Sequence, residues 1–550
     1  MIQYLLLLLP IISALVIVLS SQRAAKWIAL IGSTASLIVA AVFAVQFPHW
    51  TTGGFWPDLN TSPILGNFGV DLKIGVDSVS LLLVLLTVFL TPLAIAGSFS
   101  AITTRMREYY AWFMILEASM LLAFMSRDII FFYVGYEFTL IPMFFLISIW
   151  GGPMRGPAAI KFFIFTFLGS VFTLTSVIFV AVRHFDSTGT WTFAIADLVK
   201  FSSTQLSDRE QFWVFVGLMS GFAIKTPFFP THAWLPLAHD QAPTGGSVIL
   251  AGVLLKLGTY GVFRFALPMA PIGAVECSTF FAILGIIAIL YMSLVCWVQT
   301  DIKKLIAYSS VSHMGFVVLG LFALNPIGLQ GAVMYMVNHG LSTGALFLCI
   351  GMMYERYHTK DMEQLGGLVS KMPVWSFFMI IFTLSSVGLP GLNGFVGEFL
   401  CLMGAFVAEH DQPAGYPGVL GPWYAVVAAI GLILGAMYLL IMLGKIVWGS
   451  LREPHGQEHA QDHAQDHGQA HAQHAEIQLP TDLNFREIAI LAPIALACLA
   501  IGLYPKPLLN AVEPCVKDAL VNYPAVIDQY NAKRGLVNPG APVKQAEVKP

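Results

Sequence analysis

Long apolar stretches separated by short polar connections make up most of the chain. A helix of about 20 apolar residues crosses the hydrocarbon core of a bilayer, so each stretch predicts one transmembrane span. We therefore expect an all-α polytopic membrane protein with about 14 transmembrane helices. The predicted spans are 2–20, 27–46, 77–98, 109–126, 128–150, 158–182, 212–238, 243–267, 276–298, 302–323, 328–353, 374–409, 422–448 and 486–504.

Two of these spans carry helix-breaking residues beside a charge. In span 212–238, Lys225 is followed two and five residues later by Pro227 and Pro230, and in span 374–409, Pro390 precedes Glu398. Proline interrupts a helix, and backbone groups freed at membrane depth are tolerated only where protein or water surrounds them. Spans 7 and 12 are therefore predicted to be broken helices, and a buried charge beside each break indicates an ion path.

Six ionisable side chains lie well inside the predicted spans. A buried charge costs several kcal/mol, which favours a functional role for the lysines and glutamates, whereas each histidine could instead be a hydrogen-bonded core residue. Lysine beside a carboxylate can exchange protons when their separation changes, and histidine titrates near neutral pH. The predicted relay comprises Glu137, Lys225, Lys256, His313, His339 and Glu398.

Three further ionisable residues in the spans are weaker candidates. Glu117 lies in span 109–126 and could be a seventh member of the row. Lys161 and Lys445 lie near the membrane faces, where the lysine stem can reach the headgroups, so a structural role is favoured for both.

The positions of the charged residues suggest an internal repeat. Lys225 and Glu398 are five spans apart, and so are Glu137 and His313. An odd shift places the second unit upside down relative to the first, as in the inverted repeats of secondary transporters. We expect N-terminal helices at 1–108, inverted five-helix repeats at 109–267 and 276–448, a hydrophilic loop at 449–485, a last span at 486–504 and a C-terminal tail at 505–550.

Charge and composition fix the compartment and exclude other classes. The chain is 57% hydrophobic and 11% charged, which no soluble core requires, and its net charge of −3 indicates no nucleic-acid partner. Basic residues concentrate in the loops that follow odd-numbered spans, which places those loops in the cytoplasm and both termini outside it. These residues are Arg23, Lys26, Arg105, Arg107, Arg155, Lys161, Lys303, Lys304, Arg356, Lys360 and Lys371.

The chain contains no motif for a redox cofactor or a nucleotide. Its six cysteines form no C-x-x-C pair, and neither a dinucleotide fingerprint nor a phosphate-binding loop is present. In the loop 449–485, histidines recur every four residues from His455 to His471, so a helix would align them on one face. A solvated loop is favoured over metal binding there, and we predict no metal site in the chain.

Four motifs in order resemble the antiporter-like membrane subunits of respiratory complex I. They are FAIKTPFFPTHAWLPLAHDQAPTGGSVILAGVLLKLGTYG, DIKKLIAYSSVSHMG, NHGLSTGALF and GLPGLNGFVGEF, and the likeness covers about residues 70–450. The second broken helix distinguishes branches of this family. The paralogous L and N subunits and the related Mrp antiporter subunits typically have lysine where this chain has Glu398.

The resemblance implies roles for the residues in the spans. Glu137 would be the carboxylate that tunes Lys225, the central proton-binding lysine. Lys256, His313 and His339 would relay protons at mid-membrane depth. Glu398 would be the terminal group, and the breaks at Pro227 and Pro390 would help to hydrate the path.

The resemblance also implies partners and a location. The chain would lie in the bacterial inner membrane among lipid and other complex I membrane subunits, including L and N. FMN, iron–sulfur clusters and quinone would reside in partner subunits, leaving no cofactor in this chain. A proton-translocating subunit of NADH:quinone oxidoreductase is the leading hypothesis. The alternatives are an Mrp-type cation/proton antiporter subunit and a membrane-arm scaffold without its own proton path.

Overall fold

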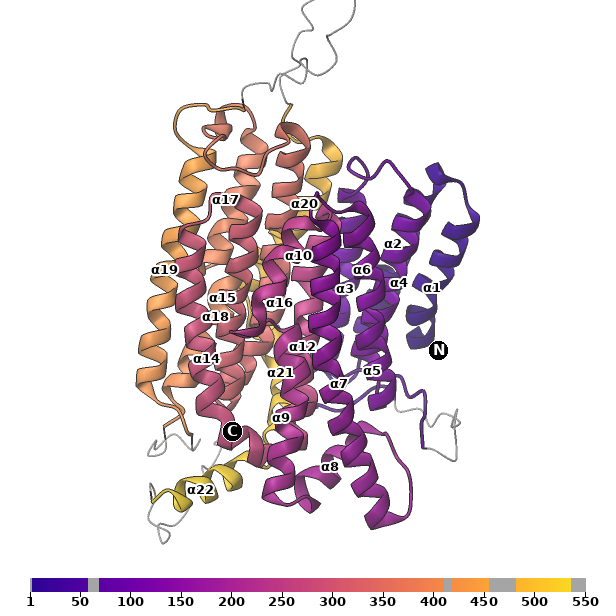
Figure 1. Cartoon of the computed structure of the whole chain (residues 1–550), viewed down its shortest axis with the longest axis vertical. Helices are drawn as coiled ribbons and strands as arrows, with labels where there is room; N and C mark the ends of the chain where they lie inside the picture. Colours follow the sequence, from indigo (N-terminus) through magenta and orange to yellow (C-terminus); the bar gives the residue numbers. More distant parts are fainter. Residues whose placement is uncertain (1, 58–68, 410–417, 455–480, 536–550) are drawn as a thin grey trace, which may run out of the picture.

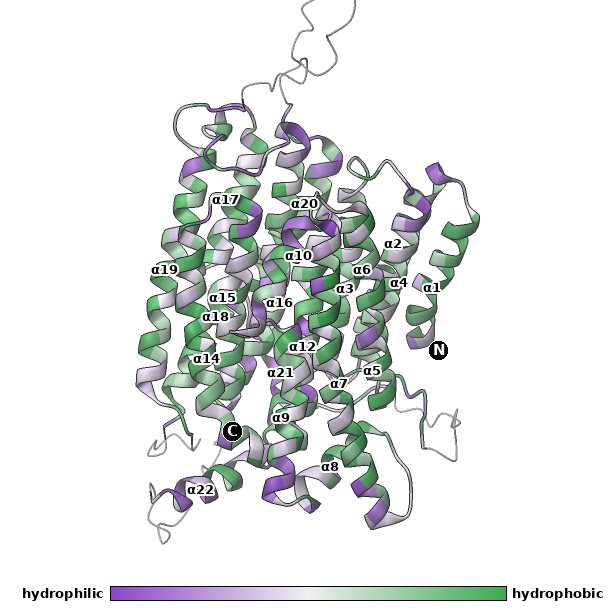
Figure 2. Cartoon of the chain, viewed as in Figure 1, coloured by the Kyte–Doolittle hydropathy of each residue, from purple (hydrophilic) through white to green (hydrophobic). Residues whose placement is uncertain are grey.

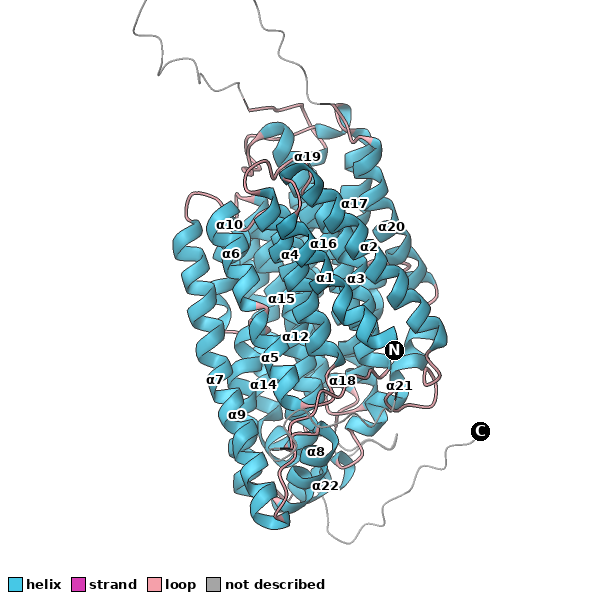
Figure 3. Cartoon of the chain, turned by 90° about the vertical axis from the view of Figure 1, so that its right-hand side faces the viewer, coloured by secondary structure: helices cyan, strands magenta, loops and turns pink. Residues whose placement is uncertain are grey.

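The computed structural model describes residues 2–57, 69–409, 418–454 and 481–535, and the predicted histidine-rich segment 455–480 lies outside them. Long helices run side by side along the vertical axis of the molecule (Figures 1 and 3). In these described ranges the elements are helical, apart from a few isolated backbone bridges between loops. The predicted all-helical class is therefore confirmed.

The α-helices of the described residues range from single turns to segments longer than a membrane is thick. In chain order they are α1 (Ile2–Leu19), α2 (Gln22–Gln46), α3 (Ser78–Gly97), α4 (Met106–Met125), α5 (Ile129–Phe138), α6 (Leu140–Trp150), α7 (Arg155–Thr188), α8 (Ile195–Gln205), α9 (Asp208–Lys225), α10 (Leu235–Gln241), α11 (Thr244–Ile249), α12 (Leu255–Gly261), α13 (Leu267–Met269), α14 (Pro271–Trp297), α15 (Ile302–Phe322), α16 (Pro326–Tyr357), α17 (Pro373–Val387), α18 (Asn393–Phe406), α19 (Pro422–Val447), α20 (Phe485–Leu503), α21 (Lys506–Ala519) and α22 (Tyr523–Lys533).

The bundle has an apolar outside and a buried centre, as a multi-pass membrane protein requires. Within the described residues, eleven helical segments are long and apolar enough to cross a membrane. The remaining three predicted spans correspond to α4, to α9 with α10, and to α17 with α18. Helices α1, α2, α7 and α19, whose ribbons are largely green for hydrophobic residues in Figure 2, have many exposed apolar side chains. By contrast, α15, α16 and the segment from α11 to α13 are almost entirely enclosed.

The two predicted helix breaks are present. Helix α9 ends at Lys225, and Pro227 follows before the short helix Thr231–Trp234 begins. Helix α17 ends at Val387 and α18 begins at Asn393, with Pro390 between them. Each break therefore places a charged residue, Lys225 or Glu398, within one or two helical turns of an interrupted backbone.

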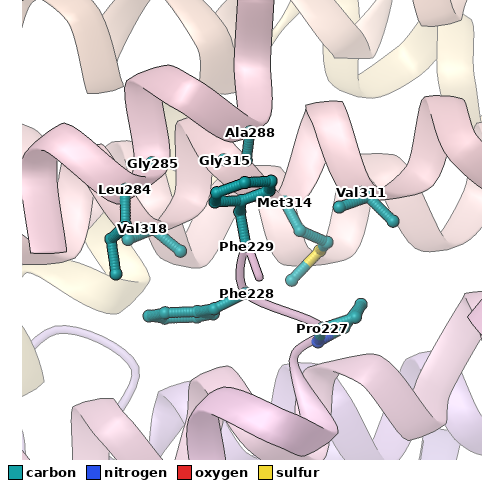
Figure 4. Close-up of a pocket in the computed structure, with 10 residues that line it drawn as sticks. All are labelled: Pro227, Phe228, Phe229, Leu284, Gly285, Ala288, Val311, Met314, Gly315 and Val318. Carbon is teal, nitrogen blue, oxygen red and sulfur yellow. The ribbon is translucent and has the colours of Figure 1, made fainter. Parts of the chain in front are cut away.

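The break after α9 is closed by its own neighbours. Ile224 O accepts a hydrogen bond from Trp234 Nε1 at 3.0 Å, and Ala223 O accepts from the backbone N–H of Phe228 at 2.8 Å. Beyond Pro227 the chain turns Phe228 and Phe229 towards the apolar faces of α14 and α15 (Figure 4). Carbonyls released by the break are thus satisfied within the protein, which makes the interruption tolerable at membrane depth.

Two further irregularities were not predicted. The span expected at 128–150 is divided into α5 and α6 at Thr139, and the span expected at 243–267 contains π-helical turns at Leu250–Leu254 and Val262–Ala266 on either side of α12. Pro142 lies three residues after Thr139 and cannot donate a helical hydrogen bond to Phe138 O, so a local signal for this break was present. π turns within α-helices commonly occur at functional sites, and both irregularities here adjoin a buried lysine.

The C-terminal tail predicted at 505–550 begins with two packed helices. Helix α21 packs against α3 and α16, and Cys515 Sγ lies 3.2 Å from Ser78 Oγ. Helix α22 packs against α14, and the Tyr523 hydroxyl donates to Leu267 O at 3.0 Å. The described part of the tail is therefore packed on the bundle, and α22 lies at the lower end of the molecule in Figure 1.

Candidate functional site

Lys225 lies at the discontinuity between α5 and α6. Its side chain is 3% exposed, and Nζ donates to Tyr136 O at 3.0 Å and to Thr139 Oγ1 at 2.9 Å. The ammonium also lies 4.0 Å from the centre of the Tyr136 ring. Two oxygens and an aromatic face together compensate a buried cation. Tyr136 O, beside the unpredicted break at Thr139, also accepts from Thr139 Oγ1 at 2.7 Å.

Glu137 stands next to this cluster but does not contact the ammonium. No ion pair within 4.0 Å joins Glu137 to Lys225 in the described part of the chain. Glu137 Oε1 is buried and has no hydrogen-bond partner among the described residues. The carboxylate is one residue from Tyr136, so its charge acts on Lys225 through space.

Lys256 and His339 form a second buried pair. Their side chains are 0% and 1% exposed, and Lys256 Nζ lies 2.7 Å from His339 Nδ1. Lys256 Nζ also donates to Ala251 O, a carbonyl within the π-helical turn Leu250–Leu254. Helix α12 adjoins the Lys225 cluster, because the space beside Gly258 is filled by Thr226. The two buried lysines therefore lie on neighbouring elements.

A third cluster surrounds Glu398. The Tyr335 hydroxyl donates to Glu398 Oε1 and lies 2.6 Å from His313 Nδ1, while His313 Nδ1 lies 3.2 Å from the same carboxylate oxygen. All three side chains are at most 5% exposed. Helices α15, α16 and α18 thus each contribute one titratable group to a single buried cluster.

The second and third clusters meet at the two histidines. The ring centres of His313 and His339 are 5.8 Å apart, and each ring makes its polar contacts through Nδ1. Within the described ranges, Nε2 of each ring is buried without a hydrogen-bond partner. The six predicted residues are therefore brought together as a row that runs from α5 through α9, α12, α16 and α15 to α18.

Sequence reasoning missed several residues that hold this row together. Tyr335 stands four residues before His339, a spacing that places both on one helix face and could have revealed it. Asn338 and Asn393 exchange hydrogen bonds, from Asn338 Nδ2 to Asn393 O at 2.6 Å and from Asn393 Nδ2 to Asn338 O at 3.2 Å. These two hydrogen bonds join α16 to α18, the second half of the second broken helix. A single asparagine in an apolar segment does not reveal its partner in the sequence.

His239 is a further buried histidine that the sequence did not single out. It is 0% exposed and stacks on Phe347 with ring centres 4.7 Å apart, and neither ring nitrogen has a hydrogen-bond partner among the described residues. Nearby, Lys360 pairs with Asp240 at 2.5 Å and Lys303 Nζ donates to Ala242 O at 2.6 Å. His239 is therefore next to a charged cluster at the end of the bundle that we predict to be cytoplasmic.

Glu398 also depends on Gly388, and a substitution tests that dependence. Gly388 has a φ of +78°, and a Cβ there would overlap Glu398 Oε2. Gly388→Ala should therefore add backbone strain of about 1–2 kcal/mol and displace the carboxylate from Tyr335 and His313. If the row carries protons, as the sequence predicts, proton transport measured in membrane vesicles should fall strongly.

Gly391→Ala is the matched control for this substitution. Gly391 also has a positive φ, of +94°, but in the described structure a Cβ there would meet nothing within 4 Å. It should carry similar backbone strain without touching Glu398. Equal pumping by the two alanine variants would show that displacement of the carboxylate has no consequence.

Comparisons with known proteins agree with this architecture over nearly the whole chain. Residues 126–420 match the family described as NADH:quinone oxidoreductase/Mrp antiporter, TM. NADH-quinone oxidoreductase subunit M of Rhodobacter capsulatus is 40% identical over 516 residues, covering 92% of each chain. NADH-ubiquinone oxidoreductase chain 4 of Marchantia polymorpha is 37% identical over 517 residues, covering 93% of this chain and 96% of that relative.

A solved structure gives the same result. A chain of respiratory complex I from Thermus thermophilus with bound NADH matches with a TM-score of 0.81 at 30% identity, covering 95% of this chain and 100% of that one. The chain therefore belongs to the family of antiporter-like membrane subunits found in NADH:quinone oxidoreductase and Mrp antiporters. Within that family it falls in the subunit M branch, named chain 4 in Marchantia, and is a subunit of respiratory complex I.

Proposed function

We propose that this subunit carries its own proton path through the membrane arm. The observation that supports it best is the buried row of titratable side chains. In it, Lys256 is hydrogen-bonded to His339, and His313 contacts both Tyr335 and Glu398. Ionisable residues inside a membrane are costly and are retained for transport or catalysis. Five members of the row, Lys225, Lys256, His313, His339 and Glu398, are at most 5% exposed, whereas Glu137 is only partly buried.

The energy of one charge pair is of the size that proton transport requires. An ion pair at about 4 Å and an effective dielectric of about 20 is worth roughly 4 kcal/mol. Moving one charge against about 150–200 mV costs roughly 3.5–4.6 kcal/mol. Lys225 is held by Tyr136 O and Thr139, not by Glu137, so forming and breaking a Glu137–Lys225 pair would be the switch that moves a proton along the row.

Further parts of the proposal concern the assembly. We place the termini outside the cytoplasm of a bacterial inner membrane and treat 109–267 and 276–448 as inverted repeats. The neighbours would be other complex I membrane subunits, including L and N, and the FMN, iron–sulfur and quinone chemistry would lie in partner subunits. Quinone reduction there would drive the changes in charge pairing here.

Glu398→Gln tests the path in the complete complex. The amide keeps the shape of the side chain but cannot take up a proton, so we expect assembly to persist while the number of protons pumped per NADH oxidised falls. The measurement is proton uptake and quinone reduction in inverted membrane vesicles. Unchanged pumping would remove Glu398 from the route and favour a membrane-arm scaffold.

The same vesicles separate the cation antiporter alternative. The family includes Mrp antiporters, in which sodium movement would accompany proton movement. Pumping by a proton-only path should be indifferent to sodium, whereas a cation/proton antiporter should lose proton movement when sodium is replaced by choline. Sodium dependence would therefore contradict the proposal.

A further inference from the structure

Tyr335 occupies a position in the row that none of the predicted residues fills. Its hydroxyl lies within hydrogen-bond distance of both His313 Nδ1 and Glu398 Oε1, and its side chain is 2% exposed. The ring centres of Tyr335, His313 and His339 form a triangle with sides of 6.0, 6.4 and 5.8 Å. The phenol is thus in contact with the last two titratable groups and beside the one before them.

The approach of α18 to α16 is built around this tyrosine. Gly397 faces Tyr335 so closely that a Cβ there would lie 2.6 Å from Tyr335 Cβ. Because Gly397 has no side chain, α18 can approach α16 closely. This approach places the neighbouring Glu398 within hydrogen-bond distance of the Tyr335 hydroxyl. The exchange between Asn338 and Asn393 fixes the same two helices one turn away.

We propose that the Tyr335 hydroxyl is a proton-transfer group that connects His313 to Glu398. The inference rests on the proposed function, since it assigns a step within the same path. With His313 carrying a proton on Nδ1 and Glu398 ionised, the three groups form a chain from Nδ1–H through the phenol O–H to Oε1. Phenols, imidazoles and carboxylates all serve as positioned proton donors and acceptors.

The step conserves protons and moves no electrons. The Nδ1–H bond of His313 breaks as a new O–H bond forms on Tyr335, while the original O–H bond of Tyr335 breaks as Oε1–H forms on Glu398. The net result is one proton moved from His313 to Glu398 with the phenol unchanged. The phenol O–H then points towards His313. Rotation of the hydroxyl back towards Glu398, with loss of the proton from Glu398 and reloading of His313, restores the starting arrangement.

His313 can be reloaded from its other side. Its Nε2 is buried and has no hydrogen-bond partner in the described part of the chain. A proton that arrives at Nε2 and leaves from Nδ1 gives the imidazole two distinct faces, one for uptake and one for release. Nδ1 is the nitrogen that faces release, because it lies 2.6 Å from the Tyr335 hydroxyl and 3.2 Å from Glu398 Oε1, and the phenol is the nearer of the two.

Tyr335→Phe removes the hydroxyl and keeps the ring. We expect the complex to assemble and NADH-dependent reduction of a water-soluble acceptor to stay normal, while the rate of proton pumping falls about tenfold or more, as for the loss of a positioned proton-transfer group. Tyr335→Gln restores a hydrogen-bonding group without an acidic proton, so it should fail in the same way. Normal pumping by either variant would overturn the inference.

Tyr438→Phe is the matched control. Tyr438 is also buried at 1% exposure, and its hydroxyl lies 2.7 Å from Ser309 Oγ and makes no hydrogen bond to a member of the row in the described ranges. Its loss should leave pumping near the parent rate, and an equal fall in both phenylalanine variants would show a merely structural role for Tyr335.

Glu398→Gln, measured in parallel, separates the role of the tyrosine from the path as a whole. Lost pumping in Glu398→Gln with full pumping in Tyr335→Phe removes the tyrosine and leaves the proposed path intact. Full pumping in both overturns the path itself.

Discussion

Replacement of Lys225 by alanine is expected to abolish proton pumping by the assembled complex. The substitution removes the cation that Tyr136 O and Thr139 Oγ1 hold at the α5–α6 break, and with it the proton that Glu137 is proposed to influence. We expect pumping in membrane vesicles to fall at least about tenfold, with quinone reduction slowed because the two processes are coupled. Loss of a buried cation relieves a desolvation cost, so assembly should persist.

Lys225→Arg decides whether charge alone is sufficient. Arginine keeps a cation at the site but holds its proton at any physiological pH, so a relay should remain blocked. Lys445→Ala is the control, since Lys445 is an exposed lysine in the last turn of α19 and lies outside the row. Pumping by the arginine variant at the parent rate would mean that Lys225 serves as a fixed charge and not as a carrier.

The chain pattern predicted the features that depend on composition and on helix-breaking residues. Apolar length predicts spans because the bilayer imposes one thickness on all of them. Pro227 and Pro390 predict breaks because proline lacks a backbone donor, and the structure interrupts α9 and α17 at these places. The buried charges beside them stand out because few residues of their kind occur in the spans.

The pattern could not supply the partners. Lys225 bonds to Tyr136 O and Thr139, where the sequence indicated Glu137, because a neighbour in three dimensions depends on the rotation and depth of each helix. The break at Thr139 did have a local signal, because Pro142 cannot donate to Phe138 O, but no charged residue follows this break in the span. Tyr335 was hidden for another reason, since a tyrosine in a membrane span is ordinarily a packing residue, and only its contacts with His313 and Glu398 mark it.

The N-terminal end of α3 contains a second kind of buried charge, one that supports the fold. Asp77 caps α3 by accepting from Ser80 N at 2.8 Å, and its other carboxylate oxygen pairs with the Arg264 guanidinium. The two side chains are 3% and 14% exposed. Burial would raise the pKa of Asp77, but the Arg264 charge and the Ser80 hydrogen bonds hold this pKa below its usual range.

Arg264→Met should therefore lower stability more than any surface substitution. Removal of one partner leaves a buried carboxylate uncompensated, which costs about 3–5 kcal/mol, and we expect the thermal unfolding temperature of this subunit in the purified complex to fall. Arg105→Met is the control, because Arg105 pairs with Glu108 at the exposed start of α4, with side chains 55% and 46% exposed. Such exposed pairs contribute little, so that variant should unfold near the parent temperature.

The pH dependence of the loss identifies its cause. In Arg264→Met, burial alone acts on Asp77, so the pKa of its carboxyl should lie above the unfolded value. A folded state that binds the proton more tightly than the unfolded chain gains stability as the pH falls and loses it as the pH rises. The loss of stability relative to the parent protein should therefore be smaller at about pH 5 than at about pH 8.

Asp77→Asn combined with Arg264→Met keeps a capping oxygen on α3 and removes the charge, so it should recover most of the stability at both pH values. Two results would contradict this: a loss of stability that is the same at every pH, or a double variant as unstable as the single one. Either would show that the guanidinium acts by filling space between Phe55 and Tyr260 and not by pairing with Asp77.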